Sequence, residues 1–462
     1  MSMENKLEML KNRHEDAKKA KAYGRLETLF DNGTFFELDP LAKSGDSAVE
    51  VLAGYGSVDG CPAYAFSQNV ENSGGAMSGA QAAKIKKLYE MAVKTGAPVI
   101  GLYDSNGAKL GEGGQMMASF GEILALGNNL SGVVPQISVV IGACQGTAAL
   151  LAVSADIVIM TKNAKLSLSV DGIGGTADAA LKDGTSHSTA ADDSEAIATV
   201  RKLITLLPSN NLTTADFSDC NEDASSVQSL QKAAEAIAAG ERASGLLLSA
   251  IGDAEAGIEL QSGFGGAAVT ALSKVGGTAA GLVLLDGGVL DGDGASKIAR
   301  FVRFCDAFSL PVITLVHTDG IASLKQAAML THAYAEATTV KISVVTGHAI
   351  GAAYIALAGR GTGADLTLAW PTAVISALSP DAAVSVLWTE KLKRMKNPQA
   401  DRAALVEEYK ETDASPMTAA AKGFLSDIID PALTRATLIR ALDMLSGKRV
   451  SGLPKKHSNI QL

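Results

Sequence analysis

The same order of hydrophobic and small residues occurs twice in this 462-residue chain, at positions 205 residues apart. Each copy has a short β-branched run, two glycines four positions apart and an Ala-rich apolar segment. The copies are Ile-Ser-Val-Val at 137–140 with Gly142 and Gly146, and the same four residues at 342–345 with Gly347 and Gly351. A β-branched run that ends in glycine before small helix formers predicts a buried strand, a tight turn and a helix. We therefore expect a duplicated unit in which a helix N-terminus, with its unpaired N–H groups, twice lies over a strand end.

The segments before each glycine turn also correspond. In the first half they are strands at 53–58 and 62–67 around an Asp-Gly pair, a helix at 80–95 and a strand at 98–103. In the second half they are a hairpin-like segment at 271–286, a helix with Lys297 and Arg300, a strand at 311–315 and a helix at 331–337. An Asp-Gly pair between strands predicts a hairpin, and strands that alternate with helices predict right-handed βα units. The fold class is therefore α/β.

The ends of the two halves follow from composition. Residues 205–230 are rich in Ser, Asn, Asp and Thr, which is typical of a domain boundary. We expect one domain at 1–225 and a second at 226–462. Residues 4–31 alternate charge with Leu, Met and Ala, which predicts a solvated surface helix, and a charged helical tail is expected at 390–446.

Charge and composition exclude several classes of protein. The formal net charge is −9 with 47% hydrophobic residues, so we expect ample cores and no nucleic-acid partner. Asp156, Lys162 and Asp365 interrupt the longest apolar stretches, so the chain itself is not expected to span a membrane. The four cysteines, Cys61, Cys144, Cys220 and Cys305, form no CxxC motif and follow no signal-like start. A cytoplasmic protein with reduced thiols is expected.

The histidines do not indicate a metal centre. His317, His332 and His348 lie in the second half, but neither HxH nor HxxxH spacing connects them, and acids at ligand spacing are missing. We therefore expect no metal site.

Several longer motifs carry a resemblance to a known family. The chain resembles the carboxyltransferase subunits of biotin-dependent acyl-CoA carboxylases and decarboxylases, such as propionyl-CoA carboxylase β chains, over roughly residues 20–445. The matching motifs are RFVRFCDAF at 300–308, LPVIT at 310–314, YAEAT at 334–338, AWPTA at 369–373, GAPVIGL at 96–102, DSNGAK at 104–109 and GVVPQIS at 132–138, with GFL at 423–425, Arg435 and IRAL at 439–442 in the tail.

The resemblance implies an architecture and partners. It implies two tandem crotonase-like (ClpP/crotonase) domains, with the active site between the N-terminal domain of one subunit and the C-terminal domain of another. A homo-oligomer is expected, as a hexamer built as a trimer of dimers. The cofactors and substrates implied are biotin on a carrier protein and an acyl-CoA. The partners implied are a biotin carboxyl carrier protein and a biotin carboxylase or decarboxylase subunit.

The chemistry implied needs N–H donors more than a side-chain base. Carboxyl transfer passes through a thioester enolate and a biotin ureido oxyanion, which positioned N–H groups stabilise. Carried over from the family, Gly146 and Thr147 are catalytic donors facing the CoA thioester, and Gly351 and Ala352 are those facing biotin. Binding roles fall on Ala353 and on the loop residues Asn106, Gly107 and Ala108. The alternative is that the glycines only let a helix pack closely on its strand.

The chain departs from the family pattern at positions that bear on activity. Thr147 stands where the family has a second glycine, and Asn106 and Lys109 replace a glycine and an arginine. The long loop that usually follows the strand at 314–316 is reduced to residues 317–322, and the segment expected to close over CoA is replaced by residues 169–175. A catalytically degenerate carboxyltransferase-like scaffold is therefore the alternative function.

Overall fold

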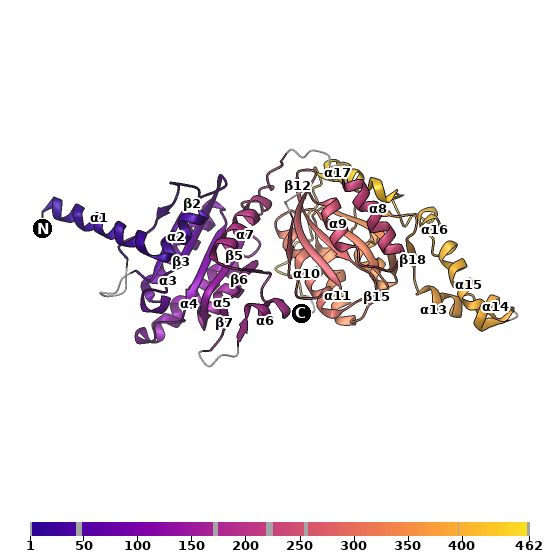
Figure 1. Ribbon diagram of the computed structural model, residues 1–462, viewed down its shortest axis with the longest axis horizontal. Helices are drawn as coiled ribbons and strands as arrows, with labels where there is room; N and C mark the ends of the chain where they lie inside the picture. The colour runs from indigo at the N-terminus through magenta and orange to yellow at the C-terminus, as the bar shows by residue number, and fades with distance from the viewer. Residues whose placement is uncertain are drawn as a thin grey trace. The chain divides into compact units, whose positions relative to one another are not determined.

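The computed structural model describes residues 2–42, 49–169, 174–218, 225–253, 257–395 and 397–459. The chain forms two compact units, Met1–Asp216 (unit 1) and Phe217–Leu462 (unit 2), each with its own sheet and helices (Figure 1). The division falls inside the polar segment 205–230, upstream of the boundary expected after residue 225. Cys220 and residues 170–173 of the segment 169–175 lie outside the described residues.

Unit 1 is built on a sheet with the strand order β1-β2-β3-β4-β5-β6-β9. β1, β2 and β3 are antiparallel, and β3, β4, β5, β6 and β9 run parallel, while β7 pairs with β5 and β8 with β7. The strands are β1 Phe36–Glu37, β2 Val51–Val58, β3 Cys61–Gln68, β4 Val99–Ser105, β5 Gln136–Gln145, β6 Ile157–Thr161, β7 Lys165–Ser167, β8 Gly174–Thr176 and β9 Ser188–Ala190. The α-helices are α1 Met3–Lys19, α2 Lys21–Leu29, α3 Gly79–Thr95, α4 Gly114–Leu130, α5 Thr147–Val153, α6 Ala177–Lys182 and α7 Asp193–Leu206.

Unit 2 repeats the main strand order and pairing directions of unit 1, although among the described residues no strand corresponds to β8, and β13 pairs with β15 in a separate two-stranded sheet. Its sheet has the order β10-β11-β12-β14-β16-β17-β19, with the same two antiparallel pairings followed by four parallel ones, and β18 pairs with β16 as β7 pairs with β5. The strands are β10 Ile258–Leu260, β11 Ala268–Val275, β12 Thr278–Leu285, β13 Val289–Leu290, β14 Val312–Thr318, β15 Gly320–Ile321, β16 Lys341–Ile350, β17 Leu366–Ala369, β18 Val374–Ser376 and β19 Asp427–Ile428. The duplication predicted from the sequence is confirmed.

Helices cover the second sheet and extend the chain beyond it. They are α8 Ser225–Ala238, α9 Ser244–Ile251, α10 Gly292–Ala307, α11 Leu324–Glu336, α12 Ala352–Leu357, α13 Pro380–Val386, α14 Thr389–Lys393, α15 Pro398–Glu411, α16 Pro416–Ala421 and α17 Thr434–Leu445. The core of unit 2 packs β12, β14 and β16 against α8, α9 and α17, whereas α13 and α15 form a smaller apolar cluster with Ile350 and Val374.

In each half, the first glycine of the pair lies within the strand and not in the turn. Gly142 and Gly347 lie inside β5 and β16, and the chain turns only at Gly146 and Gly351, where φ is 61° and 56°. Both strands continue past the first glycine, whose missing side chain leaves room for a neighbouring one. A Cβ at Gly142 would overlap the Asp104 carboxylate, and one at Gly347 would overlap the His317 ring.

The N-terminal segment is also different from the expected single surface helix. The chain is extended at Ala20, and α1 and α2 are separate helices. α2 packs against unit 1, because Ala22, Leu26 and Leu29 are buried. The amphipathic pattern at 4–31 therefore combines an exposed helix and a core helix.

A carboxylate clamps the hairpin turn of each unit to a late helix. In unit 1, Asp31 accepts hydrogen bonds from the backbone N–H groups of Asp59 and Gly60 at 3.0 and 2.9 Å and pairs with Arg201 of α7 at 2.9 Å. In unit 2, Asp253 accepts from Gly276 and Gly277 at 2.9 and 2.8 Å and pairs with Arg435 of α17 at 2.7 Å. Each unit is thus closed by the same arrangement.

Candidate functional site

The carboxyl ends of β4 and β14 form matching turns. Ser105 Oγ accepts the backbone N–H of Gly107 at 3.1 Å, and Thr318 Oγ1 accepts that of Gly320 at 3.4 Å. The register also corresponds, because Ser105 lies opposite Cys144 and Thr318 opposite Ala349 after an irregularity in each ladder. Ligands in open α/β sheets bind at the carboxyl ends of the strands, so these turns are candidate site elements.

Two of the expected donor groups are engaged within the sheet. The N–H of Gly146 donates to the Ser167 carbonyl and the N–H of Gly351 to the Ser376 carbonyl, both at 2.8 Å. Thr147 and Ala352 are the first residues of α5 and α12, where N–H groups have no acceptor inside the helix. Within the described residues the backbone N–H groups of Thr147, Ala352 and Ala353 make no hydrogen bond. These three groups are therefore the remaining candidate donors to an oxyanion.

Unit 1 brings its expected binding loop to the glycine turn. A Cβ at Gly107 would lie 3.2 Å from the carbonyl oxygen of Gln145, the residue before Gly146. Ala108 forms a bridge to Met77, and the exposed Asn106 donates its N–H to Gly74 at 3.0 Å. The residues expected at 106–108 and at 146–147 therefore lie together in unit 1.

Thr147 adds a side chain that the family pattern does not have. Its hydroxyl Oγ1 is buried and has no hydrogen-bond partner among the described residues. A buried hydroxyl without a partner is costly, so it favours a ligand oxygen or nitrogen nearby. Lys109, another departure from the family pattern, is held by an ion pair to Glu50 at 2.7 Å.

Behind the turn of unit 1 lies a buried ion pair that sequence reasoning missed. Arg25 of α2 pairs with Asp104 at 3.1 Å and with Asp193 at 2.8 Å, and the Asp104 N–H donates to Gln68 Oε1 at 3.1 Å. Burial raises the pKa of Asp104, although Arg25 opposes the shift. No spacing signal could reveal this pair, because Arg25 and Asp104 come from distant segments of the chain.

Unit 2 has two histidines and an acid at the equivalent place. His348 Nδ1 lies 2.6 Å from Asp319 Oδ1, and the His348 backbone N–H donates to His317 Nδ1 at 2.9 Å. The two rings meet edge to face with centroids 5.3 Å apart. Burial and the neighbouring His348 lower the pKa of His317. The linear spacing of these residues gave no signal, because parallel strands join them rather than one helix.

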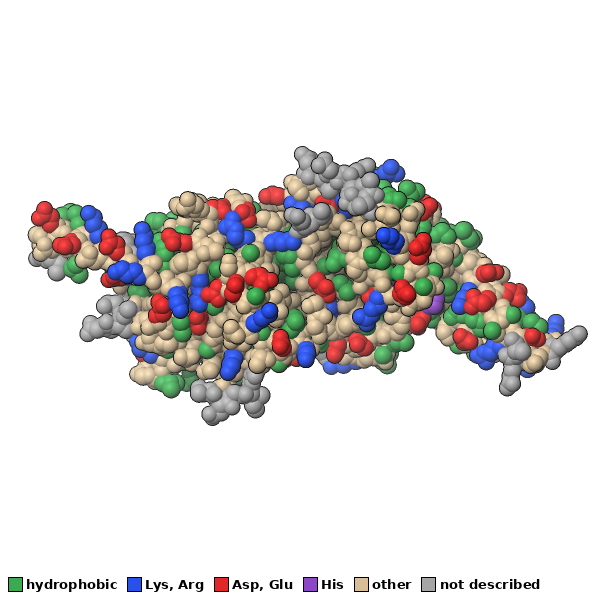
Figure 2. All heavy atoms as spheres, viewed as in Figure 1, with side chains coloured by type: hydrophobic (Ala, Val, Ile, Leu, Met, Phe, Trp, Pro, Cys, Tyr) green, Lys and Arg blue, Asp and Glu red, His purple; other side chains and the backbone are tan. Residues whose placement is uncertain are grey.

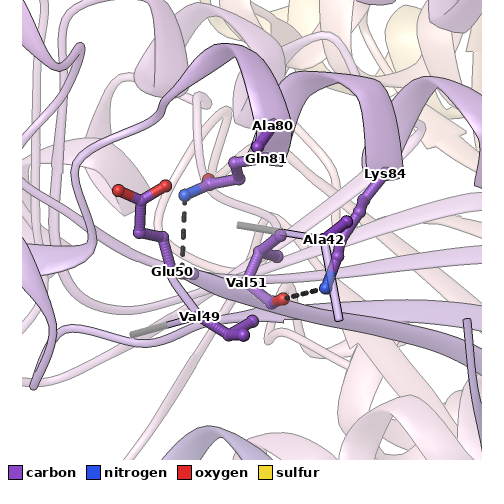
Figure 3. A pocket seen from close by; sticks show the side chains of 7 residues that line it. All are labelled: Ala42, Val49, Glu50, Val51, Ala80, Gln81 and Lys84. Carbon is purple, nitrogen blue, oxygen red and sulfur yellow. Dashed lines mark hydrogen bonds between the residues drawn. The ribbon is translucent and has the colours of Figure 1, made fainter. Parts of the chain in front are cut away.

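A small pocket in unit 1 has a structural explanation. It is lined by Ala42, Val49, Glu50, Val51, Ala80, Gln81 and Lys84 (Figure 3). Lys84 Nζ donates to the Val51 carbonyl at 3.4 Å at the start of the hairpin, and Lys297 of unit 2 donates to Ala268 in the same way at 2.8 Å. Burial lowers the pKa of each lysine to about 8. None of the expected site residues lines this pocket.

Among the described residues, His, Cys, Asp and Glu side chains form no group of three or more placed to hold a metal ion. In the same part of the chain, helices long and apolar enough to cross a membrane are missing. Acidic and basic side chains are interspersed on the face drawn in Figure 2.

Comparison with known proteins agrees with this geometry. The chain matches the Carboxyl transferase domain family over residues 13–460. It is 33% identical over 484 residues to the methylmalonyl-CoA decarboxylase subunit alpha of Propionigenium modestum, covering 96% of this chain and 93% of the relative. It is 32% identical over 516 residues to the propionyl-CoA carboxylase carboxyltransferase subunit of Haloferax mediterranei, covering 100% of both chains. The structure of transcarboxylase 12S, a hexamer with methylmalonyl-CoA and methylmalonic acid bound, matches with a TM-score of 0.89 and 30% identity over 100% of this chain and 99% of that one.

The fold and the paired glycine turns define a tandem crotonase-like protein of the carboxyltransferase class. The chain belongs to the carboxyl transferase family. The family, the fold class and the enzymatic carboxyl transfer expected from the sequence are confirmed.

Proposed function

We propose that this chain transfers a carboxyl group between an acyl-CoA thioester and biotin on a carrier protein. The observation that carries the proposal is the duplicated turn, which leaves the N–H of Thr147 in unit 1 and those of Ala352 and Ala353 in unit 2 without acceptors among the residues that the structure describes. Such donors stabilise an oxyanion where negative charge develops. We assign the unit 1 donors to the thioester and the unit 2 donors to the ureido group.

The residues of each unit have separate tasks. In unit 1 the Thr147 N–H donates to the thioester oxygen as the enolate forms, and its hydroxyl and the loop at Gly107 and Ala108 border the same place. In unit 2 the N–H groups of Ala352 and Ala353 donate to the ureido oxygen. Biotin supplies a ureido nitrogen that carries the carboxyl group between sites. Gly146 and Gly351 position these donors through their own bonds to Ser167 and Ser376.

The relatives indicate the substrate class and the partners. Their names include methylmalonyl-CoA decarboxylase and propionyl-CoA carboxylase, so we propose the methylmalonyl-CoA and propionyl-CoA pair as substrate. The partners proposed are a biotin carboxyl carrier protein and either a biotin carboxylase or a decarboxylase subunit in the cytoplasm. That partner sets the direction, since both directions share the transfer step.

A homo-oligomer completes the proposal. Leu150 of α5 and Ile355 of α12 follow their glycine turns at the same spacing and are 43% and 55% exposed. Exposed apolar side chains beside a site mark a surface that a partner covers. We propose a hexamer, as in transcarboxylase 12S, in which unit 1 of one copy and unit 2 of another complete each site.

The donors can be removed one at a time. Proline is tolerated at the first residue of a helix and has no N–H, so Thr147→Pro and Ala352→Pro delete one donor each and retain the helix. We expect each to lower kcat for carboxyl transfer from methylmalonyl-CoA to biotin by about 100- to 1,000-fold. Thr147→Ser and Ala352→Ser keep the N–H and serve as matched controls with near wild-type rates.

The scaffold alternative gives a different result. Calorimetry with acetyl-, propionyl-, methylmalonyl- and glutaconyl-CoA measures binding independently of turnover. Binding of none of these thioesters, together with no transfer by the wild type, would contradict the proposed function and support a degenerate scaffold. Acyl-dependent binding with transfer that the proline variants abolish supports the enzyme and names its acyl group.

A further inference from the structure

The pair formed by His348 and Asp319 lies at the carboxyl edge of the sheet in unit 2. His348 is near the end of β16, four residues before Ala352, and Asp319 follows β14 directly. α12, which begins at Ala352, contacts β15 next to Asp319. The pair therefore shares its edge of the sheet with the N–H donors assigned above to the ureido group.

The hydrogen bonds fix the orientation of the His348 ring. Its Nδ1 is 2.6 Å from the Asp319 carboxylate, so in the neutral ring Nδ1 carries the proton and Nε2 carries the lone pair. A carboxylate on Nδ1 also stabilises the imidazolium that forms when Nε2 takes a proton. The His348 side chain is 34% exposed, so the ring is open to solvent rather than closed in the core.

His317 holds this arrangement from behind. Its Nδ1 accepts the backbone N–H of His348 at 2.9 Å, which requires a neutral ring. Burial lowers the pKa of His317, so the ring remains an acceptor near neutral pH. His348, Asp319 and Asp286 are the charged or titratable groups that act on His317. The other elements packed around His348, namely β18 and the first turn of α12, present Val374, Ile375, Ser376 and the alanines 352 and 353, which carry no charge.

We infer that His348, oriented by Asp319, is the proton-transfer residue for the ureido nitrogen in this chain. When the C–C bond to the carboxyl group of the acyl-CoA breaks, its electron pair passes to the thioester enolate and the carboxyl carbon leaves as CO2. The N–H electron pair of the ureido group becomes the new C–N bond, and a π pair of CO2 moves to oxygen. The ureido proton goes to His348 Nε2 and from there to the enolate carbon, which restores the neutral ring, and in the reverse direction the same transfer returns it to nitrogen. The inference rests on the proposed function, which places biotin at unit 2 and supplies the carboxyl group from the acyl-CoA.

His332 provides a matched control. It is also 34% exposed, also lies in unit 2 and also has an acid nearby, Glu336, at 3.4 Å, but it lies on helix α11 and its Nδ1 makes no hydrogen bond within the described residues. His348→Gln and His332→Gln therefore remove the same ring from equally exposed positions near an acid. Asp319→Asn keeps the His348 ring and removes only the charge that orients it.

The first measurement is the pH dependence of methylmalonyl-CoA to biotin transfer by the full-length protein. General acid–base groups contribute about 100- to 10,000-fold, so we expect a loss of that size in His348→Gln with the acid limb of the profile abolished. Asp319→Asn should lose less, since it keeps the His348 ring and removes only the carboxylate that orients it. His332→Gln should keep the wild-type rate and profile.

The second measurement does not depend on turnover. Hydrogen exchange at the imidazole C2 position, read by mass spectrometry, reports the pKa and access of each histidine. We expect saturating free biotin to slow exchange at His348 and to leave His332 unchanged.

The outcomes separate the two proposals. Wild-type transfer with an unchanged rate and profile in His348→Gln would overturn the histidine inference alone. No transfer by the wild type, with no effect of biotin on His348 exchange, would overturn both. Biotin protection of His348 without transfer would overturn the proposed enzyme function and the proton-transfer role, and leave only a binding contact.

Discussion

The residue that faces the mid-strand glycine differs between the two units. In unit 1, Asp104 faces Gly142 and forms a buried ion pair with Arg25, whereas in unit 2 His317 faces Gly347 as a buried neutral ring. The backbone around them is the same, with a Ser or Thr hydroxyl closing the strand-end turn in both. The turn geometry therefore depends on the glycines and hydroxyls, while the buried side chain sets which charges lie nearby. Unit 1 keeps a fixed charge pair, and unit 2 keeps an uncharged ring beside His348.

The largest test of this difference is Arg25→Met. It leaves the Asp104 carboxylate buried without a cation, and breaking such a pair costs about 3–5 kcal/mol. Burial already raises the pKa of Asp104, so the folded state binds more protons than the unfolded state just above the usual carboxyl pKa. The variant should therefore recover stability as pH falls from 7 to 5. Urea unfolding followed by hydrogen exchange in β4 measures the loss, with β14 as the internal reference.

Arg303→Met is the control for the loss of an exposed arginine. Arg303 pairs with Glu336 at 3.4 Å and is 38% exposed, so its removal should cost less than about 1 kcal/mol. A loss of stability in Arg25→Met as small as that in Arg303→Met would contradict the fixed charge pair in unit 1. A loss of the same size at pH 5 and pH 7 would contradict it as well.

A smaller effect is expected from alanine at the two mid-strand glycines. Gly142→Ala forces its methyl group against Asp104, and Gly347→Ala forces it against His317. Overpacking of this kind costs about 1–3 kcal/mol. We expect the larger loss at Gly142, because Asp104 can move only by stretching its bond to Arg25. Thermal unfolding with Gly121→Ala on α4, where a Cβ meets nothing within 4 Å, provides the baseline. Equal losses at the two glycines would show that the side chains behind them do not differ in rigidity.

The last comparison concerns the buried lysines that both units share, and it includes the smallest expected loss of stability. Lys297 donates to two carbonyls at 2.8 and 3.1 Å, and Lys84 to one at 3.4 Å. Lys297→Met should cost about 1–3 kcal/mol because it leaves two acceptors unsatisfied, whereas Lys84→Met should stay within about 1 kcal/mol.

These lysines also predict a pH dependence. Burial lowers both pKa values from 10.5 to about 8, so the folded state binds fewer protons than the unfolded state between these values. Stability from each lysine therefore rises with pH across that window. We expect the melting temperature of each Met variant to fall relative to that of the wild type between pH 7.5 and pH 9.5. A difference that stays constant would refute the depressed pKa.

Much of the fold was predictable because it depends on local sequence. Turn residues fixed the hairpins, where Asp59 and Gly60 both have positive φ, and the repeated strand and glycine pattern gave two equivalent units. The exceptions are residues whose role comes from a distant partner. Gly142 was assigned to a turn because Asp104 behind it is not visible in the local pattern, and α2 was assigned to the surface because its buried face depends on unit 1.

Only those parts of the site that follow from the local backbone pattern or from family motifs could be predicted. The loop at 106–108 and the turn at 146–147 do lie together in unit 1, whereas their catalytic roles stay predictions. The set of candidate donors could be reduced only from the structure, because the N–H groups of Gly146 and Gly351 donate to carbonyls on other strands. The linear spacing of His317 and His348 gave no signal for the same reason, since adjacent strand ends join them across a long separation in sequence.

The aspartate clamps on the two hairpin turns have a consequence for synthesis. Arg201 and Asp31 are separated by 170 residues, and Arg435 and Asp253 by 182. At roughly 5–20 residues per second, the ribosome leaves each aspartate without its arginine for about 9–36 s. Each hairpin therefore emerges long before the helix that secures it, and unit 1 can close while unit 2 is still being translated.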